Sequence, residues 1–155
     1  MRVVLDELLP VTCRARPFTT TGGLETKTVS EQSRILMVDD EPSTCWIVGK
    51  QLLLSGYDAD CVYDASSALT KLNDESFDLL LIDLVMGDMS GLDLLRTIRA
   101  ADNHIPAIIL TAHESLESAI EATHLRVSDY VVKSPHFLQV LLDAVERALN
   151  EPPSR

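Results

Sequence analysis

The alternation of short apolar runs with longer segments of helical periodicity constrains the fold of this chain more than any other feature of its sequence. Clear apolar runs lie at 35–38, 79–82, 107–110 and 130–132, and a weaker one lies at 58–62. These runs are too short for helices, and their continuous apolar character is typical of strands that are buried on both faces. The sequence therefore predicts five strands.

The segments between these strands place apolar residues at the spacing of one helix face. They cover 65–72, 92–98, 116–123 and 137–148. Strands and helices that alternate in this way form a parallel sheet with right-handed crossovers and helices on both faces. In such sheets ligands bind beyond the carboxyl ends of the strands, so the residues after each strand are candidates for a functional site.

The segment after the first strand is also predicted to be helical, but it is too apolar to define a buried face. Trp46 and Leu53 share one side of it, and we assign them to core packing rather than to a docking patch. Ser43 is the expected N-cap of this helix, and Gly56 is expected just after its C-cap. Asp64 is the expected N-cap of the next helix.

The composition is that of an ordinary globular protein. Of the 155 residues, 46% are hydrophobic and 24% are charged, which suits one domain with its own core. The formal net charge of −11 argues against nucleic-acid binding by this chain, because such binding needs a basic surface. No apolar stretch approaches the length of a membrane span, and the N-terminus makes a poor signal peptide. We therefore expect a cytoplasmic protein that does not bind a membrane.

The three cysteines, Cys13, Cys45 and Cys61, lack the spacing of metal ligands and have no histidine at short range. Cys45 and Cys61 lie in apolar stretches, and we interpret them as small core residues. In a cytosolic protein all three thiols are expected to be reduced.

The two ends of the chain differ from its centre. Residues 1–32 contain prolines, glycines and a threonine-rich patch without a sustained period, and we interpret them as a flexible extension. Residues 33–150 are expected to form the domain, and residues 151–155 a disordered tail. Because the sequence ends soon after the last expected helix, no DNA-binding or catalytic output domain is expected.

Polar residues lie at the ends of four of the five predicted strands. Asp39 and Asp40 come after the first strand and Asp83 after the third. Thr111 comes after the fourth strand, and Lys133 ends the fifth. Because parallel strands end at the same edge of the sheet, the sequence predicts that three carboxylates, a hydroxyl and an ammonium group meet there.

This combination of groups predicts phosphoryl transfer to a carboxylate. Clustered carboxylates raise one another's pKa unless a cation neutralises them. Oxygen ligands without histidine or cysteine favour Mg²⁺. A lysine and a threonine hydroxyl suit the remaining charge on phosphoryl oxygens. We therefore expect Asp83 to be the phospho-acceptor, beside Mg²⁺ held by Asp39 and Asp40, with Thr111 and Lys133 as its catalytic partners.

Over about three quarters of its length the chain resembles the receiver domains of two-component response regulators. The resemblance rests on VDDEP at 38–42, on Asp83, on Gly91, on Thr111-Ala112, and on Asp129-Tyr130 with Lys133. It implies a single-domain receiver like the chemotaxis regulators, an α/β fold with a doubly wound, flavodoxin-like sheet in the order 2-1-3-4-5. It also implies that the main-chain carbonyl of Val85 completes the metal shell and that Thr111 and Tyr130 act as a switch.

The resemblance further implies the partners. A sensor histidine kinase or a histidine phosphotransfer protein would supply the phosphoryl group, and an output protein that the sequence does not identify would read a changed surface. The protein would phosphorylate and dephosphorylate itself as a switch rather than turn over a substrate. A homodimer is left open.

The sequence departs from the family at three places outside the chemical positions. Gly87 stands where the family commonly has proline, Arg126-Val127 where it has a Gly-Ala pair, and Ser134 where it often has proline. These differences affect the expected shape of the loop after Asp83 and of the turn before the fifth strand.

Three other functions share parts of this pattern. A haloacid-dehalogenase type of enzyme needs an aspartate nucleophile after the first strand and a second acid two residues later, which Asp39-Asp40-Glu41 does not match. A flavodoxin-like flavin binder needs a phosphate loop where the acidic pair stands. A receiver-like interaction module that is not phosphorylated usually loses an acid or the lysine, yet it remains the alternative.

Overall fold

The computed structural model describes residues 32–87 and 89–151. Its strands are β1 (Arg34–Val38), β2 (Asp58–Val62), β3 (Leu79–Asp83), β4 (Ala107–Thr111) and β5 (Asp129–Val132). Its helices are α3 (Pro42–Leu54), α4 (Ala65–Asp74), α5 (Gly91–Ala100), α6 (Leu116–His124) and α7 (Phe137–Asn150). The expected extension and tail lie outside the described residues, apart from Gln32 and Glu151.

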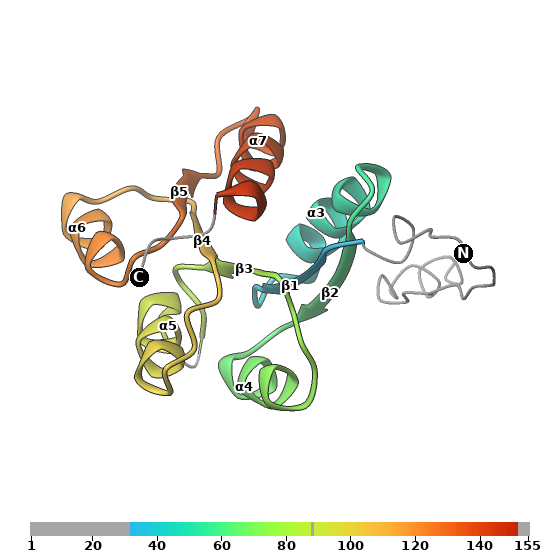
Figure 1. The fold of residues 1–155 in the computed structure, drawn as a ribbon. Helices are drawn as coiled ribbons and strands as arrows, with labels where there is room; N and C mark the ends of the chain where they lie inside the picture. Colours follow the sequence, from blue (N-terminus) through green and yellow to red (C-terminus); the bar gives the residue numbers. More distant parts are fainter. Residues whose placement is uncertain (1–31, 88, 152–155) are drawn as a thin grey trace.

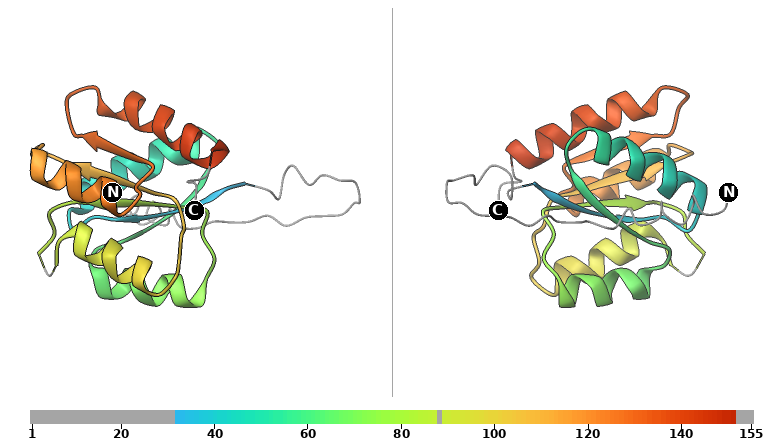
Figure 2. Two further views of the ribbon diagram at one scale, coloured as in Figure 1. Left: turned by 60° about the vertical axis from the view of Figure 1, so that its left-hand side comes forward. Right: turned by 90° about the vertical axis from the view of Figure 1, so that its right-hand side faces the viewer.

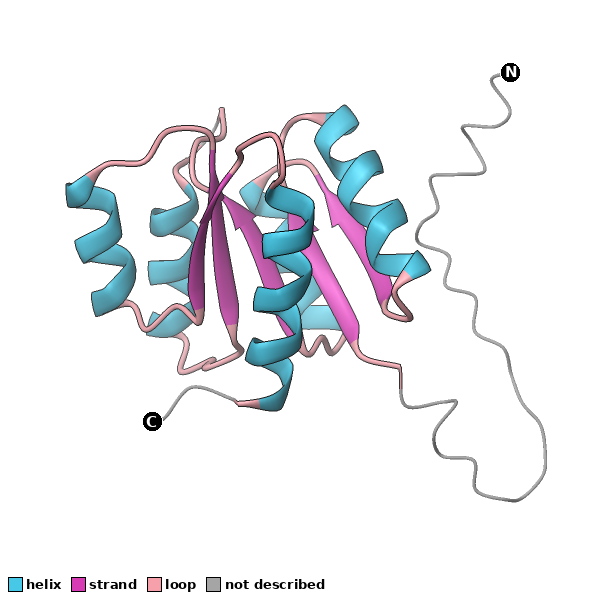
Figure 3. Ribbon diagram, turned by 90° about the horizontal axis from the view of Figure 1, so that it is seen from above, coloured by secondary structure: helices cyan, strands magenta, loops and turns pink. Residues whose placement is uncertain are grey.

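The five strands form one sheet in the order β2-β1-β3-β4-β5 (Figure 1). Every neighbouring pair is parallel, so all strands run in the same direction (Figure 3). The predicted doubly wound parallel sheet with the order 2-1-3-4-5 is confirmed. No helix in the part of the chain that the structure describes is long and apolar enough to cross a membrane.

Helices cover both faces of the sheet, α3 and α7 on one side and α4, α5 and α6 on the other (Figure 2). Successive strand residues point to opposite faces. Along β1, Ile35 and Met37 therefore pack toward α3 and α7, whereas Leu36 and Val38 pack toward α4 and α5. Strands buried on both sides explain why the apolar runs are continuous.

The helix starts agree only in part with the prediction. The side chain of Asp64 accepts a hydrogen bond of 2.7 Å from the amide of Ser67, so its assignment as the N-cap of α4 is confirmed. The assignment of Ser43 as the N-cap of α3 is wrong, because Glu41 occupies that position. Pro42 starts the helix earlier, since its fixed φ suits the first helical residue and it needs no amide partner there.

The assignment of Trp46 and Leu53 to the core is also wrong. Their exposed fractions are 48% and 44%, and α3 packs on the sheet through an adjacent side, with Val48 and Leu52 buried. The ammonium of Lys50 lies 5.1 Å from the centre of the Trp46 ring, so the Lys50 side chain covers part of the ring. Because α3 is apolar on every side, its sequence does not show which side is buried.

Cys45 of α3 and Cys61 of β2 form a disulfide bond, so the expectation that these thiols are reduced is wrong. Their Cα atoms lie 6.2 Å apart, within the range that a disulfide spans. The two residues are 16 positions apart in the sequence and meet only because α3 packs on β2. Cys45 belongs to the buried core cluster on the α3 side, as predicted, whereas Cys61 is partly buried and packs against that cluster. Cys13 lies outside the described residues.

Three helices, α3, α5 and α6, end with the same pair of main-chain hydrogen bonds, the Schellman motif, and after α5 the residue with positive φ is Asp102, at 63°. At the end of α3, Gly56 has a φ of 95° and its amide donates to Leu53, which confirms its predicted place after the C-cap. At the end of α6, Arg126 takes this role with a φ of 58°. A residue with a side chain is strained in this conformation by roughly 1–2 kcal/mol. Arg126, which stands where the family has glycine, therefore forms the same turn but lowers the free energy of unfolding.

A half-buried guanidinium group joins α5 to α6. Arg99 donates hydrogen bonds to the main-chain oxygens of Ile105 (2.8 Å) and Leu125 (3.0 Å). Burial, together with the nearby charge of Arg126, lowers the pKa of Arg99. The contacts connect the end of α5, the segment before β4 and the end of α6 at one point.

Gly91, the first residue of α5, lies against the end of β3. Its amide donates a 2.8 Å hydrogen bond to the carbonyl of Leu84. A Cβ atom at this position would lie 2.2 Å from the main-chain oxygen of Asp83 and 2.7 Å from the Ile82 side chain. A residue other than glycine would therefore push α5 away from the strand that ends at Asp83.

We predict that Gly91→Ala lowers the free energy of unfolding by about 2 kcal/mol, the usual cost of overpacking a closely packed site. Urea denaturation of the two proteins measures this difference. Gly87→Ala is the matched control, because a Cβ there would lie 3.7 Å from its nearest neighbour, Asp40 Oδ2, which is an ordinary contact. Equal unfolding midpoints for the two variants would show that the close approach at Gly91 costs nothing.

Candidate functional site

The register of β1 and β3 places Asp39 and Asp83 side by side. Val38 pairs with Ile82, so the next residue of each strand lies beside the other at the carboxyl edge of the sheet. Both side chains are buried, with exposed fractions of 0% for Asp39 and 7% for Asp83. By the alternation of each strand they lie on the face that α3 and α7 cover. The structure therefore brings these two acids together, as the sequence predicts.

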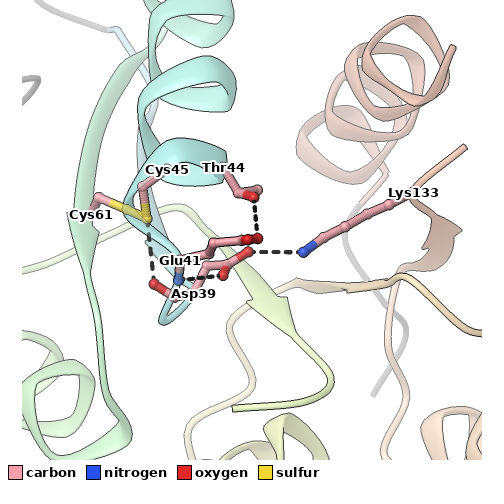
Figure 4. The surroundings of a disulfide bond; sticks show 6 residues. All are labelled: Asp39, Glu41, Thr44, Cys45, Cys61 and Lys133. Carbon is pink, nitrogen blue, oxygen red and sulfur yellow. Dashed lines mark hydrogen bonds and ion pairs between the residues drawn. A yellow bond between two sulfur atoms is a disulfide. The ribbon is translucent and has the colours of Figure 1, made fainter. Parts of the chain in front are cut away.

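Hydrogen bonds hold Asp39 by both its main chain and its side chain. Its amide donates to the carbonyl of Val62 at the end of β2 (3.1 Å). Its Oδ1 accepts from the amide of Glu41 (2.9 Å), and its Oδ2 accepts from Nζ of Lys133 (3.0 Å) (Figure 4). The Asp39 carboxylate therefore has a fixed orientation.

Lys133 bridges the two buried acids. Its Nζ also donates to Oδ1 of Asp83 at 3.1 Å, and its amide donates to the carbonyl of Thr111 (2.7 Å), which fixes the start of the side chain. Burial acts to lower the pKa of Lys133, but the hydrogen bonds with Asp39 and Asp83 and their charges outweigh burial and raise it. The group is therefore an ammonium at neutral pH.

The pKa of Asp83 is raised from its ordinary value. Burial is the main cause, and the charges of Asp39 and Asp40 add to it, while the hydrogen bond and the charge of Lys133 act in the opposite direction. One ammonium group therefore does not fully offset the combined effect of burial and of the two neighbouring acids on Asp83. A further cation at this place would favour the ionised form of Asp83.

Asp40 forms the open side of the cluster. It is exposed, and its Oδ2 accepts a 3.1 Å hydrogen bond from the amide of Gly87, so the loop after β3 folds back over β1. The sequence did not indicate this contact. Val85 lies in the same loop with 68% of its surface exposed, and the assignment of its carbonyl as a metal ligand stays a prediction.

Asp39, Asp40 and Asp83 can together hold a metal ion. Each offers one carboxylate oxygen, and these oxygens all lie within 4.8 Å of one another. A set of carboxylate ligands with one side toward solvent fits Mg²⁺, which prefers oxygen ligands and keeps several of its waters. The chemistry of the donor set therefore agrees with the metal expected from the sequence.

Thr111 and Tyr130 share the face of the sheet that α4, α5 and α6 cover. Thr111 is fully buried; its hydroxyl donates to the carbonyl of His113 (2.8 Å) and accepts from the amide of the same residue (3.1 Å). Tyr130 is half-buried, and its hydroxyl lies 2.6 Å from Oγ of Ser118 on α6. The two residues expected to form the switch are therefore tied to the loop after β4 and to α6.

Sequence reasoning missed Ser118 as the partner of Tyr130. The two residues are 12 positions apart and meet only through the packing of α6 against β5. The sequence offered one weak signal, because Ser118 lies within a predicted amphipathic helix at a polar position. Such a position is usually exposed to solvent.

Comparison with known proteins agrees with this fold. Residues 35–146 match the family described as the response regulator receiver domain, and the chain belongs to this family. It is a receiver domain of the kind found in two-component response regulators, which act as switches.

Curated relatives are longer than this chain. The transcriptional regulatory protein ZraR of Salmonella typhimurium is 37% identical over 115 residues, which are 74% of this chain and 26% of the relative. The transcriptional regulatory protein TrcR of Mycobacterium tuberculosis is 32% identical over 109 residues, 70% of this chain and 42% of the relative. The chain thus spans about a quarter to two fifths of the length of these relatives.

Solved structures of similar proteins have the same fold. A CheY-like receiver domain protein from Methanospirillum hungatei has a TM-score of 0.73 and 28% identity, covering 78% of this chain and 96% of that one. The response regulator TrrA from Thermotoga maritima, solved in complex with Mg²⁺ and BeF, has a TM-score of 0.66 and 30% identity, covering 74% of this chain and 98% of that one.

We predict that Asp83→Asn stabilises the metal-free protein at neutral pH. A raised pKa means that ionised Asp83 is less favourable in the folded state than in the unfolded state, so its charge lowers stability above that pKa. Asparagine removes the charge and can still accept from Lys133. The gain in unfolding free energy, measured in EDTA, should shrink as the pH falls through the raised pKa of Asp83 toward that of an unfolded aspartate.

Asp143→Asn is the control, because Asp143 is exposed on α7. It should have a small effect on stability, below about 0.5 kcal/mol, like most surface substitutions. A loss of stability in Asp83→Asn at neutral pH would contradict the picture of three acids that repel one another in the metal-free site.

Proposed function

We propose that the protein accepts a phosphoryl group on Asp83 in a Mg²⁺-dependent reaction and thereby switches a surface that binds other proteins. The observation that supports this most directly is the surroundings of Asp83. Its carboxylate is buried, is grouped with those of Asp39 and Asp40, and lies 3.1 Å from the ammonium of Lys133. Membership of the receiver-domain family agrees with such a role.

In this proposal Asp39, Asp40, Asp83 and the carbonyl of Val85 hold Mg²⁺. When bound, the ion offsets the charge of the carboxylates and of the phosphoryl oxygens. An oxygen of Asp83 attacks phosphorus, and the bond from phosphorus to the donor atom breaks, which leaves an aspartyl phosphate.

The remaining groups of the site would act on the phosphoryl oxygens. Lys133 is already an ammonium beside Asp83 and can exchange one of its two carboxylate contacts for a phosphoryl oxygen. The hydroxyl of Thr111 can turn from the carbonyl of His113 and donate to another oxygen. Each of these groups offsets charge that develops during the transfer.

The donor would be a sensor histidine kinase or a histidine phosphotransfer protein, and the receiver of the signal an output protein. We place the protein in the cytoplasm, as its family suggests, and expect it to act as a switch rather than a turnover enzyme. The net charge of −11 argues against nucleic-acid binding by this chain, although relatives are transcriptional regulators by name. A homodimer is compatible with this function.

The signal would leave the site along β4 and α6. If Thr111 turns toward a phosphoryl group on Asp83, the loop at His113 loses two hydrogen bonds. That loop leads into α6, whose Ser118 contacts the hydroxyl of Tyr130. A shift of α6 would break this contact and let the tyrosine ring take another position. The phosphoryl group can shift the population only because it contacts the two states unequally.

We predict that the protein gains one phosphoryl group when it is mixed with Mg²⁺ and acetyl phosphate, measured as intact mass. Asp83→Asn should gain none, because an amide is no nucleophile, whereas the exposed-site variant Asp143→Asn should be labelled like the wild type. Asp40→Ala should weaken Mg²⁺ binding. Labelling of Asp83→Asn to the wild-type extent would falsify the site assignment, and no labelling of the wild type would favour an interaction module that is not phosphorylated.

We also predict that Thr111→Ala still accepts the phosphoryl group but passes the signal poorly to Tyr130. The readout is the change in backbone amide shifts around Tyr130 and Ser118 on adding beryllofluoride and Mg²⁺, measured by NMR. Thr111→Ser keeps the hydroxyl and should retain most of that change. If the alanine variant shows the same shifts as the wild type, the hydroxyl has no part in the coupling.

A further inference from the structure

The disulfide between Cys45 and Cys61 lies next to Asp39, a residue of the proposed metal site. The Sγ atom of Cys45 is 3.6 Å from the main-chain oxygen of Asp39 (Figure 4). Cys61 directly precedes Val62, whose carbonyl accepts the hydrogen bond from the amide of Asp39. The disulfide therefore joins the two elements, α3 and β2, that contact Asp39 on either side of its main chain.

We propose that Cys45 and Cys61 form a reversible redox site that controls cation binding by the acidic cluster. Each state would give Asp39 different surroundings. In the disulfide the sulfur of Cys45 bears no hydrogen, and α3 and β2 are joined by a covalent bond. In the dithiol the bond is gone, and the thiol of Cys45 can donate to the carbonyl of Asp39 as a weak hydrogen bond.

The oxidised form should bind Mg²⁺ more tightly. Three carboxylates that repel one another tend to move apart, and Asp39 is held from both sides, by the amide of Glu41 at the start of α3 and by the carbonyl of Val62 at the end of β2. With the disulfide intact, the metal meets ligands that are already in position, which reduces the cost of ordering them on binding. After reduction, α3 and β2 can separate slightly, and Asp39 can shift with them. The inference rests on the metal site of the proposed function.

The chemistry requires a dithiol reductant. One of its thiolates attacks a sulfur of the pair, most readily that of Cys61, because Cys61 is partly exposed whereas Cys45 is 3% exposed. A mixed disulfide forms on Cys61 and Cys45 leaves as a thiolate. The second reductant thiol then releases Cys61, so the protein gains two electrons and two protons while the reductant becomes a disulfide. Disulfides in cytosolic proteins are usually transient or redox-sensing, which agrees with such a role.

Because Mg²⁺ binding and oxidation are thermodynamically linked, the proposal can be tested through the Mg²⁺ affinity and through the redox midpoint. If oxidation tightens Mg²⁺ binding by some factor, Mg²⁺ must favour the disulfide by the same factor. Coupling free energies of this kind commonly correspond to roughly 5- to 150-fold changes in affinity. We expect about a tenfold difference here, which equals a shift of about 30 mV in the midpoint of a two-electron couple.

The experiment uses the full chain with Cys13→Ser, so that only the Cys45–Cys61 pair can react. Calorimetry measures the affinity for Mg²⁺ in the oxidised form and in the form reduced with dithiothreitol. A separate redox titration in dithiothreitol buffers compares the midpoint in Mg²⁺ with that in sodium chloride of equal ionic strength. We expect about tenfold tighter binding when oxidised, and a midpoint that Mg²⁺ shifts to more reducing potentials by about 30 mV.

A Cys45→Ala, Cys61→Ala variant in the same background shows the effect without the bond. It should bind Mg²⁺ with the affinity of the reduced form, whether or not dithiothreitol is present. Equal affinity of the oxidised and reduced forms, with an unshifted midpoint, would overturn this inference and leave the proposed metal site intact. Absence of Mg²⁺ binding in both forms would overturn the proposed function and the inference together.

Discussion

The arrangement of the carboxyl edge depends on one charge interaction, the bridge from Lys133 to Asp39 and Asp83. Without a cation, buried carboxylates at neighbouring strand ends would repel each other and favour opening of the sheet edge. In the sheet, β3 and β4 lie between β1 and β5, so the strand order determines how far the side chain of Lys133 must extend to reach Asp39. Its amide is fixed by the carbonyl of Thr111, so its flexible stem extends from a defined point across β4 to both acids. The fold therefore places one positive charge, that of Lys133, beside the acids, and the three carboxylates can hold a second cation.

Local periodicity and strand direction account for the features that could be predicted from the sequence. The strands were found because buried strands form continuous apolar runs, and the meeting of Asp39, Asp83 and Lys133 was expected because parallel strands share an edge. Features that depend on which surfaces pack together were missed. The buried side of α3, the disulfide between Cys45 and Cys61, and the contact of Ser118 with Tyr130 all arise from tertiary packing. No short-range pattern in the sequence records such contacts.

The two parts of the candidate site lie on opposite faces of the sheet. Asp39 and Asp83 point toward α3 and α7, the side that also contains the disulfide. Thr111 and Tyr130 point toward α4, α5 and α6. Contact between these parts is confined to the carboxyl edge, where the loop after β4 turns. A change on the acidic side can therefore reach the tyrosine side only around the strand ends, because the sheet between them is a closely packed core.

The guanidinium of Arg99 has a mechanical consequence for α6. It ties the carbonyl of Leu125, at the end of that helix, to α5 and to the segment before β4. The opposite end of the helix is more open, since Leu116 has 78% of its surface exposed. A helix that is held at one end is displaced most easily at its other end. The start of α6 lies next to the acidic edge and is held there by the contact of Ser118 with Tyr130, so a change in the loop at His113 that breaks this contact would displace the start of the helix more than the end held by Arg99.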